Sequence, residues 1–202
     1  TWPRGMVVNL SGQRYCDEAS YGAVIGTRMY RNNLAQGMLI IDSELYNNST
    51  EFLSRDARSL ISIVVKQQLK TAYQADTLEQ LAELTGIDSG NLLATVELYN
   101  ACARGEQQDP FNKSPSDMSV IAKPPFYAID LAAGGSPALS LGGLAVDENS
   151  GQVKTLEGIG IEGLYAAGRT AVGIASNNYV SGLSIADGVF SGRRAGASAA
   201  KL

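Results

Sequence analysis

Glycine is unevenly distributed along this chain of 202 residues, and its distribution constrains the fold more than any other feature. Nine of the 22 glycines lie between Gly134 and Gly168, whereas the residues before them follow helix and strand periodicities. Glycine weakens regular elements and favours turns and close backbone approaches. We therefore predict an α+β fold of two domains, residues 1–133 and residues 134–202.

In the first predicted domain, apolar periodicity and capping residues define the elements. We expect strands over 6–9 and 38–42, one amphipathic helix over 50–73, and two shorter helices that Thr77 and Asp88 cap and that Gly86 and Gly105 end. The turn 10–13 is expected to lead into a hairpin with 14–18, and the proline-rich residues 109–125 form a connector.

The second predicted domain begins with a hairpin. Segments 141–146 and 153–155 flank the polar turn 147–151, and residues 163–168 are expected to form a buried strand. A final helix is expected over 181–200, with Gly188, Gly192 and Gly196 on one face that permits close packing.

Composition excludes several classes of function. The chain has no histidine, so it cannot supply a Ser-His-Asp triad, a Cys-His dyad or a histidine-ligated metal site. Its 16 Lys and Arg against 20 Asp and Glu give a net charge of −4, which disfavours nucleic-acid binding. The most apolar run, 60–65, is far shorter than the roughly 20 residues of a membrane span.

The cysteines bear on the compartment. Cys16 and Cys102 are too few for a disulfide framework or a four-cysteine metal site, so we predict a reducing, cytoplasmic location with both thiols in apolar packing. The opening Thr1-Trp2-Pro3 has the character of a piece of a longer protein, and this too is an expectation from the sequence.

One motif is a decoy. Residues 158–163 match the spacing GxGxxG, but a dinucleotide fingerprint needs a strand before it and a helix after it. Here a polar hairpin precedes the motif and a strand follows. We interpret it as a loop, which leaves the chain without a phosphate-binding glycine turn.

Several motifs together resemble one family. The C-terminal segments Gly163-Leu-Tyr-Ala-Ala-Gly-Arg169, Gly182–Asp187 and Gly192–Gly196 are similar to the closing flavin-binding signature of the fumarate reductase and 3-ketosteroid dehydrogenase superfamily. Earlier segments match that superfamily in the same order: Arg4–Asn9, Gly12–Glu18, Leu81–Ile87, Val96–Asn100, Pro124–Ala128 and Gly142–Asp147.

The resemblance implies an enzyme with FAD as its cofactor. Residues 1–133 would be its catalytic domain and residues 134–202 the returning strands and helix of an FAD-binding α/β domain whose N-terminal Rossmann half this chain lacks. The implied flavin contacts are Ala167, Gly168, Arg169, Leu183, Ser184 and Ile185. Arg169 departs from the family, which usually has Glu there.

The resemblance also bears on the substrate. Fumarate-type members grip a dicarboxylate with Arg and His, since two negative charges need cationic partners. This chain has no His, and Tyr179 stands where those members place a substrate-binding Arg. Residues 178–184 resemble instead the ketosteroid Δ4-(5α)-dehydrogenase variant. The implied reaction is the α,β-desaturation of a 3-ketosteroid, a small apolar ketone.

By the same resemblance, Tyr179 would donate to the ketone oxygen, and Ser181 with Tyr21 would accept or relay the α-proton. Each assignment has a plainer alternative. Ser181 can cap the last helix, Tyr21 can be a core residue, and the adjacent Asp17 and Glu18 are expected to be solvated or capping. Gly142 and Gly143 either admit the flavin ring or serve a turn.

Two other functions stay open. The chain could be a truncated domain that binds an apolar ligand or a partner subunit without flavin, or part of a reductase of another enoate. We expect no metal and no nucleic-acid partner. The partner expected is the missing N-terminal FAD-binding half, without which residues 134–202 should expose apolar surface and self-associate.

Overall fold

The computed structural model describes residues 4–55, 60–133, 141–174 and 179–201. The chain divides into two compact units, Thr1–Gly135 and Ser136–Leu202. Each unit has its own buried apolar residues and is described here by itself.

The first unit is built on an antiparallel sheet of four strands. Its strands are β1 (Met6–Val8), β2 (Met38–Ile41), β3 (Tyr73–Ala75) and β4 (Phe126–Asp130), in the order β1-β2-β4-β3. Met6 pairs with Ile40, and Ile40 pairs in turn with Ala128. The strands predicted over 6–9 and 38–42 are therefore confirmed.

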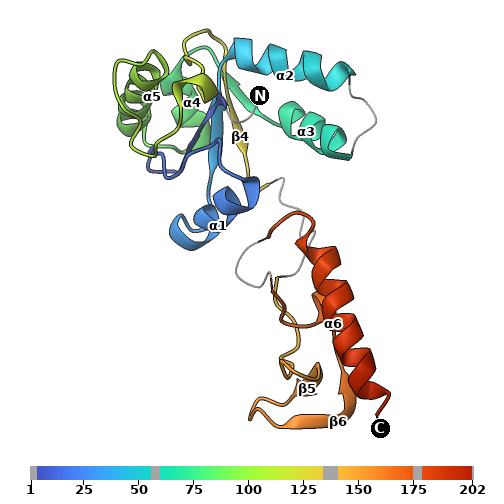
Figure 1. Ribbon diagram of the computed structural model, residues 1–202. Helices are drawn as coiled ribbons and strands as arrows, with labels where there is room; N and C mark the ends of the chain where they lie inside the picture. The colour runs from blue at the N-terminus through green and yellow to red at the C-terminus, as the bar shows by residue number, and fades with distance from the viewer. Residues whose placement is uncertain (1–3, 56–59, 134–140, 175–178, 202) are drawn as a thin grey trace. The chain divides into compact units, whose positions relative to one another are not determined.

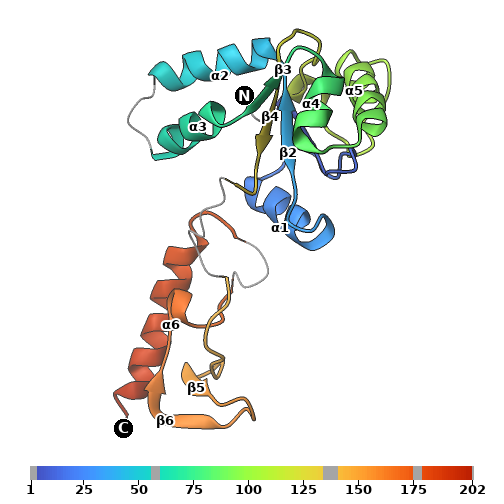
Figure 2. The same ribbon diagram turned by 180° about the vertical axis from the view of Figure 1, so that it is seen from behind.

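Helices cover both faces of this sheet (Figure 1). They are α1 (Gly22–Asn32), α2 (Ser43–Arg55), α3 (Leu60–Lys70), α4 (Leu78–Thr85) and α5 (Ser89–Ala103), with a short 3-10 helix η2 (Pro115–Asp117) in the connector. The alternation of a strand assigns its side chains to opposite faces. Ile40 packs in the core with residues of α4 and α5, whereas Leu39 and Ile41 pack with residues of α1, α2 and α3. Figure 2 shows the two helix layers from behind.

Local capping signals located the shorter helices correctly. The Thr77 side chain accepts a hydrogen bond from the Gln80 amide at 3.2 Å, and that of Asp88 from the Asn91 amide at 2.8 Å. Gly86 ends α4 in the left-handed conformation, at φ 72°.

The single helix predicted over 50–73 is wrong. The structure has two helices there, and α2 already begins at Ser43. Asp42 starts it, because its carboxylate accepts a hydrogen bond from the Leu45 amide at 3.0 Å.

The second unit contains a small sheet and one long helix. Strands β5 (Gln152–Lys154) and β6 (Gly160–Tyr165) pair antiparallel, and α6 (Leu183–Ala199) packs beside β6 and the 3-10 helix η3 (Gly168–Thr170). Residues 160–163 of the decoy motif lie within β6, so the interpretation of the motif as a loop is wrong over these four residues. The chain continues from it as a strand and not as the helix that a dinucleotide fingerprint needs. Segment 141–146 makes two isolated bridges, Leu144 to Ala171 and Val146 to Val153, and only the second reaches β5, so the main partner of β5 is β6.

The burial predicted for residues 163–168 is observed only in part. Gly163 and Leu164, at the end of β6, are exposed, whereas Ala166 just after the strand is buried. A side chain at Gly188, Gly192 or Gly196 would meet no atom within 4 Å in the described part of the chain. The close packing that this spacing permits therefore stays a prediction. Over the residues that the structure describes, no helix is long and apolar enough to span a membrane.

Candidate functional site

The N-terminus of α6 is the first component of the candidate site. Its N-cap is Gly182 in the left-handed conformation, at φ 86°, and the cap makes no side-chain hydrogen bond. The interpretation of Ser181 as the cap is therefore wrong, and Ser181 is exposed. Because the first turn also holds no acidic residue, the partial positive charge of this helix end is not neutralised by its own side chains.

Arg169 joins this helix end to Tyr179. Its Nη2 donates a hydrogen bond to Oγ of Ser184 in the first turn of α6, and its guanidinium carbon lies 5.6 Å from the centroid of the Tyr179 ring. That distance is within the range of a cation–π contact. The structure thus brings together three of the residues that the sequence assigns to the site.

The backbone at Gly168 is the third component of the candidate site, beside Arg169 and the N-terminus of α6. Gly168 begins η3 at φ 58°, and its amide donates to Oγ of Ser191 on α6 at 2.9 Å. The Ser191 hydroxyl donates in turn to the Asp187 carbonyl at 2.5 Å. Ala167 is the N-cap of η3 and Leu183 is half-buried, whereas Ile185 is 77% exposed.

Tyr21 lies in the first unit, at the N-cap of α1, with 49% of its surface exposed. The interpretation of Tyr21 as a core residue is therefore wrong. Its side chain does not cap the helix. Tyr179 and Ser181 belong to the second unit, so the meeting of Tyr21 with them is part of the proposal below.

A buried ionic cluster holds the segment that leads to Tyr21. We define it as Arg14, Glu18, Asp109 and Lys113. Arg14 pairs with Glu18 at 2.8 Å and with Asp109, and Lys113 pairs with Glu18 at 3.0 Å. The expectation that Glu18 is solvated or capping is wrong, because its side chain has no exposed surface. Asp17, by contrast, accepts a hydrogen bond from the Ala19 amide at 2.8 Å, as a capping residue does.

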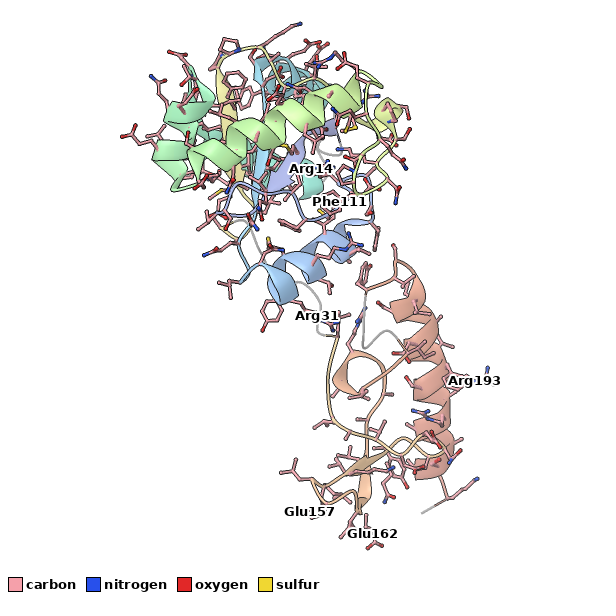
Figure 3. The ribbon with its side chains drawn as sticks, turned by 90° about the vertical axis from the view of Figure 1, so that its left-hand side faces the viewer. Arg14, Arg31, Phe111, Glu157, Glu162 and Arg193 are labelled. Atoms are coloured by element: carbon pink, nitrogen blue, oxygen red, sulfur yellow. The ribbon has the colours of Figure 1, made fainter. Side chains whose placement is uncertain are left out.

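Aromatic rings line this cluster. The Arg14 guanidinium carbon lies 4.9 Å from the Tyr99 ring centroid and 5.2 Å from that of Phe111, which Figure 3 shows beside Arg14. The Lys113 ammonium donates to the Tyr99 hydroxyl at 3.0 Å and to the Gly5 carbonyl at 2.9 Å. Sequence reasoning missed this cluster: the i, i+4 spacing of Arg14 and Glu18 was a signal, but Lys113 follows 95 positions later.

Burial shifts the pKa values of several groups here. It lowers the pKa of Lys113, and the charge of Glu18 offsets this only in part. For Asp109, burial acts to raise the pKa, but the hydrogen bond and charge of Arg14 outweigh it, so the pKa is lowered. Burial, with the charge of Glu18, raises the pKa of Cys16 to about 12, so this thiol is not a ready nucleophile.

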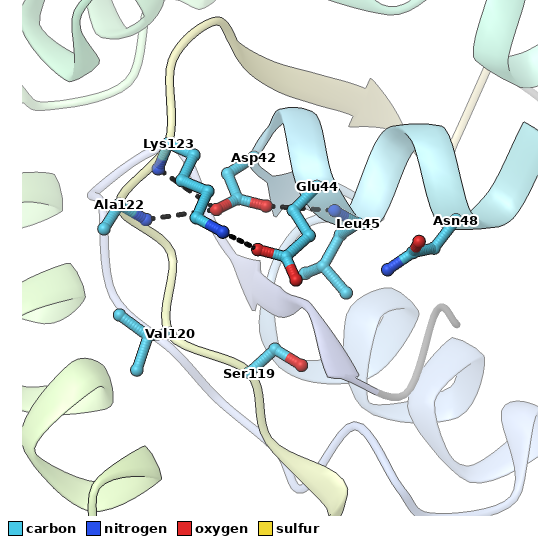
Figure 4. Close-up of a pocket in the computed structure, with 8 residues that line it drawn as sticks. All are labelled: Asp42, Glu44, Leu45, Asn48, Ser119, Val120, Ala122 and Lys123. Carbon is cyan, nitrogen blue, oxygen red and sulfur yellow. Dashed lines mark hydrogen bonds and ion pairs between the residues drawn. The ribbon is translucent and has the colours of Figure 1, made fainter.

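Another cavity lies apart from these residues. It has a volume of about 350 Å³ and is lined by residues of α2 and the 119–123 segment, among them Asp42 and Lys123 (Figure 4). The Asp42 carboxylate accepts hydrogen bonds from the amides of Ala122 and Lys123 at 3.2 and 3.1 Å, and Lys123 pairs with Glu44. Its charged groups are thus occupied in holding the loop to the helix, and no predicted site residue lines it.

An open apolar groove runs along α6. It has a volume of about 950 Å³, and its lining includes Ile185, Val189 and Phe190. Phe190 is 59% exposed. Within the described ranges, no group of three or more Cys, Asp or Glu side chains is arranged to hold a metal ion.

Comparison with known proteins identifies the family. The family model of an FAD binding domain matches residues 2–185. The chain is 35% identical over 180 residues to the 3-oxo-5-alpha-steroid 4-dehydrogenase of Comamonas testosteroni, a match that covers 83% of this chain and 33% of that enzyme. It is also 34% identical over 197 residues to the NADH:acrylate oxidoreductase of Vibrio harveyi, covering 96% of this chain and 18% of that protein.

A solved structure agrees with these relatives. The 3-ketosteroid-Δ4-(5α)-dehydrogenase from Rhodococcus jostii RHA1, in complex with 4-androstene-3,17-dione, matches with a TM-score of 0.72 and 34% identity. The match covers 100% of this chain and 39% of that one, so the chain spans little more than a third of the length of these steroid enzymes. The resemblance predicted from the motifs is confirmed, and the chain belongs to the FAD binding domain family of oxidoreductase flavoproteins, whose cofactor is FAD.

Proposed function

We propose that this chain is part of an FAD-dependent dehydrogenase that introduces a double bond beside the ketone of a 3-ketosteroid. One observation carries this proposal: the Tyr179 ring stands at the uncapped positive end of α6, held there by Arg169. A phenol at this point suits a neutral ketone, whereas a dicarboxylate would need cationic partners for its two charges. The cation beside Tyr179, Arg169, is already engaged with Ser184 and with the Tyr179 ring. The steroid 4-dehydrogenases among the relatives support the same substrate class.

The residues at the N-terminus of α6 and around Gly168 fit FAD. The first turn of α6 offers backbone N–H groups and a partial positive charge, and Gly168, at φ 58°, lets the backbone turn close to a ligand. Ala167, Gly168, Arg169, Leu183, Ser184 and Ile185 would hold the cofactor. FAD, when bound, supplies the acceptor for the β-hydride of the substrate.

The other steps belong to residues of this chain. The Tyr179 hydroxyl would donate a hydrogen bond to the ketone oxygen, where negative charge develops as the α-proton leaves. Tyr21 and Ser181 would accept or relay that proton; a positioned group of this kind contributes about 10²- to 10⁴-fold. Both side chains are exposed to solvent, as groups that meet a substrate must be.

The relatives are much longer than this chain, and the additional length would supply the rest of the FAD domain. In this proposal residues 1–133 are the catalytic domain, residues 134–202 return to the FAD domain, and the absent part is its Rossmann half. The exposed side chains of β6 and the apolar groove along α6 provide surfaces for that part to cover. The cytoplasmic location is part of this proposal and rests on the small number of cysteines in the sequence.

One other function has a specific observation in its favour. The acrylate oxidoreductase of Vibrio harveyi is 34% identical to this chain, which favours the reduction of an enoate by the same candidate site. A flavin-free domain that only binds an apolar ligand or partner is the third candidate.

The test uses the extended protein, by which we mean this chain joined to the N-terminal portion that its relatives carry. We expect flavin absorption bands at near-stoichiometric level and desaturation of a 5α-3-ketosteroid with a dye as electron acceptor. Enoate reduction by a reduced dye, without steroid turnover, would favour the acrylate-type function. A colourless protein without either activity would leave the flavin-free domain.

A further inference from the structure

Arg169 is the one implied flavin contact at which this chain departs from the family, which usually has Glu there, so the resemblance does not say what its charge does. Its guanidinium is half-buried and bridges three segments: η3, which carries it, the Tyr179 ring, and the first turn of α6 through Oγ of Ser184. A planar guanidinium can stack on a ring and donate from its edge at the same time, which an ammonium cannot do in one geometry.

The charge of Arg169 matters as much as its shape. A cation over an aromatic ring is attracted to the ring electrons, and the attraction grows as negative charge builds on the phenol oxygen. The positive end of α6 acts in the same sense, because it too favours negative charge nearby. Both effects strengthen the Tyr179 hydroxyl as a hydrogen-bond donor at the moment when the ketone oxygen becomes an enolate.

We propose that Arg169 is a positioning residue that fixes the Tyr179 ring against the first turn of α6 and strengthens its hydrogen bond to the ketone oxygen of the substrate. This inference rests on the proposed function, since it assigns the ketone to Tyr179. It requires both the charge and the planar shape of the guanidinium. Arg169 itself need not touch the substrate.

The test measures the ketone directly. In the extended protein, 4-androstene-3,17-dione labelled with ¹³C at C3 reports the strength of the hydrogen bond to its carbonyl through the ¹³C chemical shift. We expect a downfield shift on binding that Tyr179→Phe largely abolishes. Arg169→Met should remove much of it and lower kcat about tenfold, with KM changed less than about threefold.

Matched variants separate charge from structure. Arg169→Lys keeps the cation and should recover part of the ¹³C shift and of kcat, whereas Ser184→Ala, which loses one hydroxyl, should give a smaller loss than Arg169→Met. Arg104→Met is the control, because Arg104 is about half exposed at the end of α5 and pairs there with Glu106. It should leave the ¹³C shift unchanged.

The outcomes distinguish the two proposals. If Arg169→Met binds the steroid with the wild-type ¹³C shift and kcat, the positioning role is overturned while the proposed function stands. If Arg169→Met fails to fold, the same comparison is made with Ser184→Ala. A wild-type ¹³C shift and kcat in that variant would overturn the positioning role. If the steroid does not bind, or Tyr179→Phe leaves its shift unchanged, the assignment of the ketone to Tyr179 fails and the inference falls with it.

Discussion

The ammonium of Lys113 donates to the carboxylate of Glu18 at 3.0 Å, and neither side chain is exposed to solvent. Glu18 also accepts hydrogen bonds from the Val7 amide at 2.9 Å and from Arg14. The pair therefore ties the proline-rich connector to strand β1 and to the segment that precedes Tyr21. Buried charges of this kind are costly to leave without a partner.

Removing one member of the pair should destabilise the first unit. We expect Lys113→Met to lower the free energy of unfolding by roughly 3–5 kcal/mol, because Glu18 is left buried with one cation fewer. The measurement is urea denaturation of the chain, with tyrosine fluorescence as the signal that reports unfolding.

The control for this prediction is another lysine–glutamate pair. Lys123 pairs with Glu44 while both side chains stay more than half exposed, so Lys123→Met should cost less than about 1 kcal/mol. Equal losses for the two variants would contradict the view that burial makes the Lys113 pair important.

Asp109 should make stability depend on pH. Arg14 lowers its pKa below the ordinary 3.8 despite burial, so the ionised form is favoured in the folded protein. A carboxyl whose folded pKa is depressed contributes stability above its unfolded pKa and loses that contribution as pH falls through the folded pKa. The contribution should therefore be complete above about pH 5, decline as the pH falls below about 4, and be lost only once the pH has passed the lowered folded pKa.

The measurement compares urea midpoints of the wild type and Asp109→Asn from pH 6 to pH 2.5. The variant should be less stable at pH 6, and the difference should shrink as the pH falls below about 4. Asp117→Asn serves as the control, because Asp117 is exposed. A difference between wild type and Asp109→Asn that stays constant with pH would show that the ion pair with Arg14 is not its source.

Gly143 should be required by a close backbone approach, whereas Gly142 should not. A methyl group at Gly143 would lie 2.5 Å from the Thr170 carbonyl oxygen, and one at Gly142 would meet no atom within 4 Å in the described structure. Gly143→Ala should therefore separate segment 141–146 from η3 and cost about 1–3 kcal/mol locally. Gly142→Ala should change stability by less than about 0.5 kcal/mol.

Hydrogen exchange can test the glycine prediction at two amides. Leu144 donates to the Thr170 carbonyl at 2.8 Å, and Val172 donates to that of Leu144 at 3.0 Å. Both amides should exchange faster in Gly143→Ala and at the wild-type rate in Gly142→Ala. Unchanged protection in Gly143→Ala would mean that the backbone relaxes without losing this bridge.

The sequence predicts local features of this fold better than features formed by distant residues. The caps at Thr77 and Asp88 depend on amides three residues away, and both are confirmed. The start of α2 depends on Asp42, whose second carboxylate oxygen is held by amides some 80 positions later. Apolar periodicity carries no information about such a distant contact, so the helix predicted over 50–73 was misplaced.

The same distinction applies to the site. The motifs at Arg169, Tyr179 and Ser184 are close in sequence, and their contacts form within one unit. The buried state of Glu18 depends on Lys113, 95 positions later in the sequence. Such a contact cannot be derived from the local pattern, so the prediction that Glu18 is solvated or capping was wrong.

Tyr21 provides the most direct test of the proposed proton transfer. Tyr21 is 49% exposed at the N-cap of α1, and Tyr21→Phe keeps the aromatic ring, so the free energy of unfolding should change by less than about 1 kcal/mol. If its hydroxyl accepts or relays the α-proton in the extended protein, kcat should fall about 10²-fold or more. The primary isotope effect with substrate deuterated at the α-carbon should rise in parallel, because proton abstraction then limits turnover.

Tyr30→Phe is the matched control on the same helix, with 75% of its surface exposed, and should leave both values unchanged. Equal kinetics for the two variants would remove Tyr21 from the mechanism and leave Ser181 as the proton acceptor to examine.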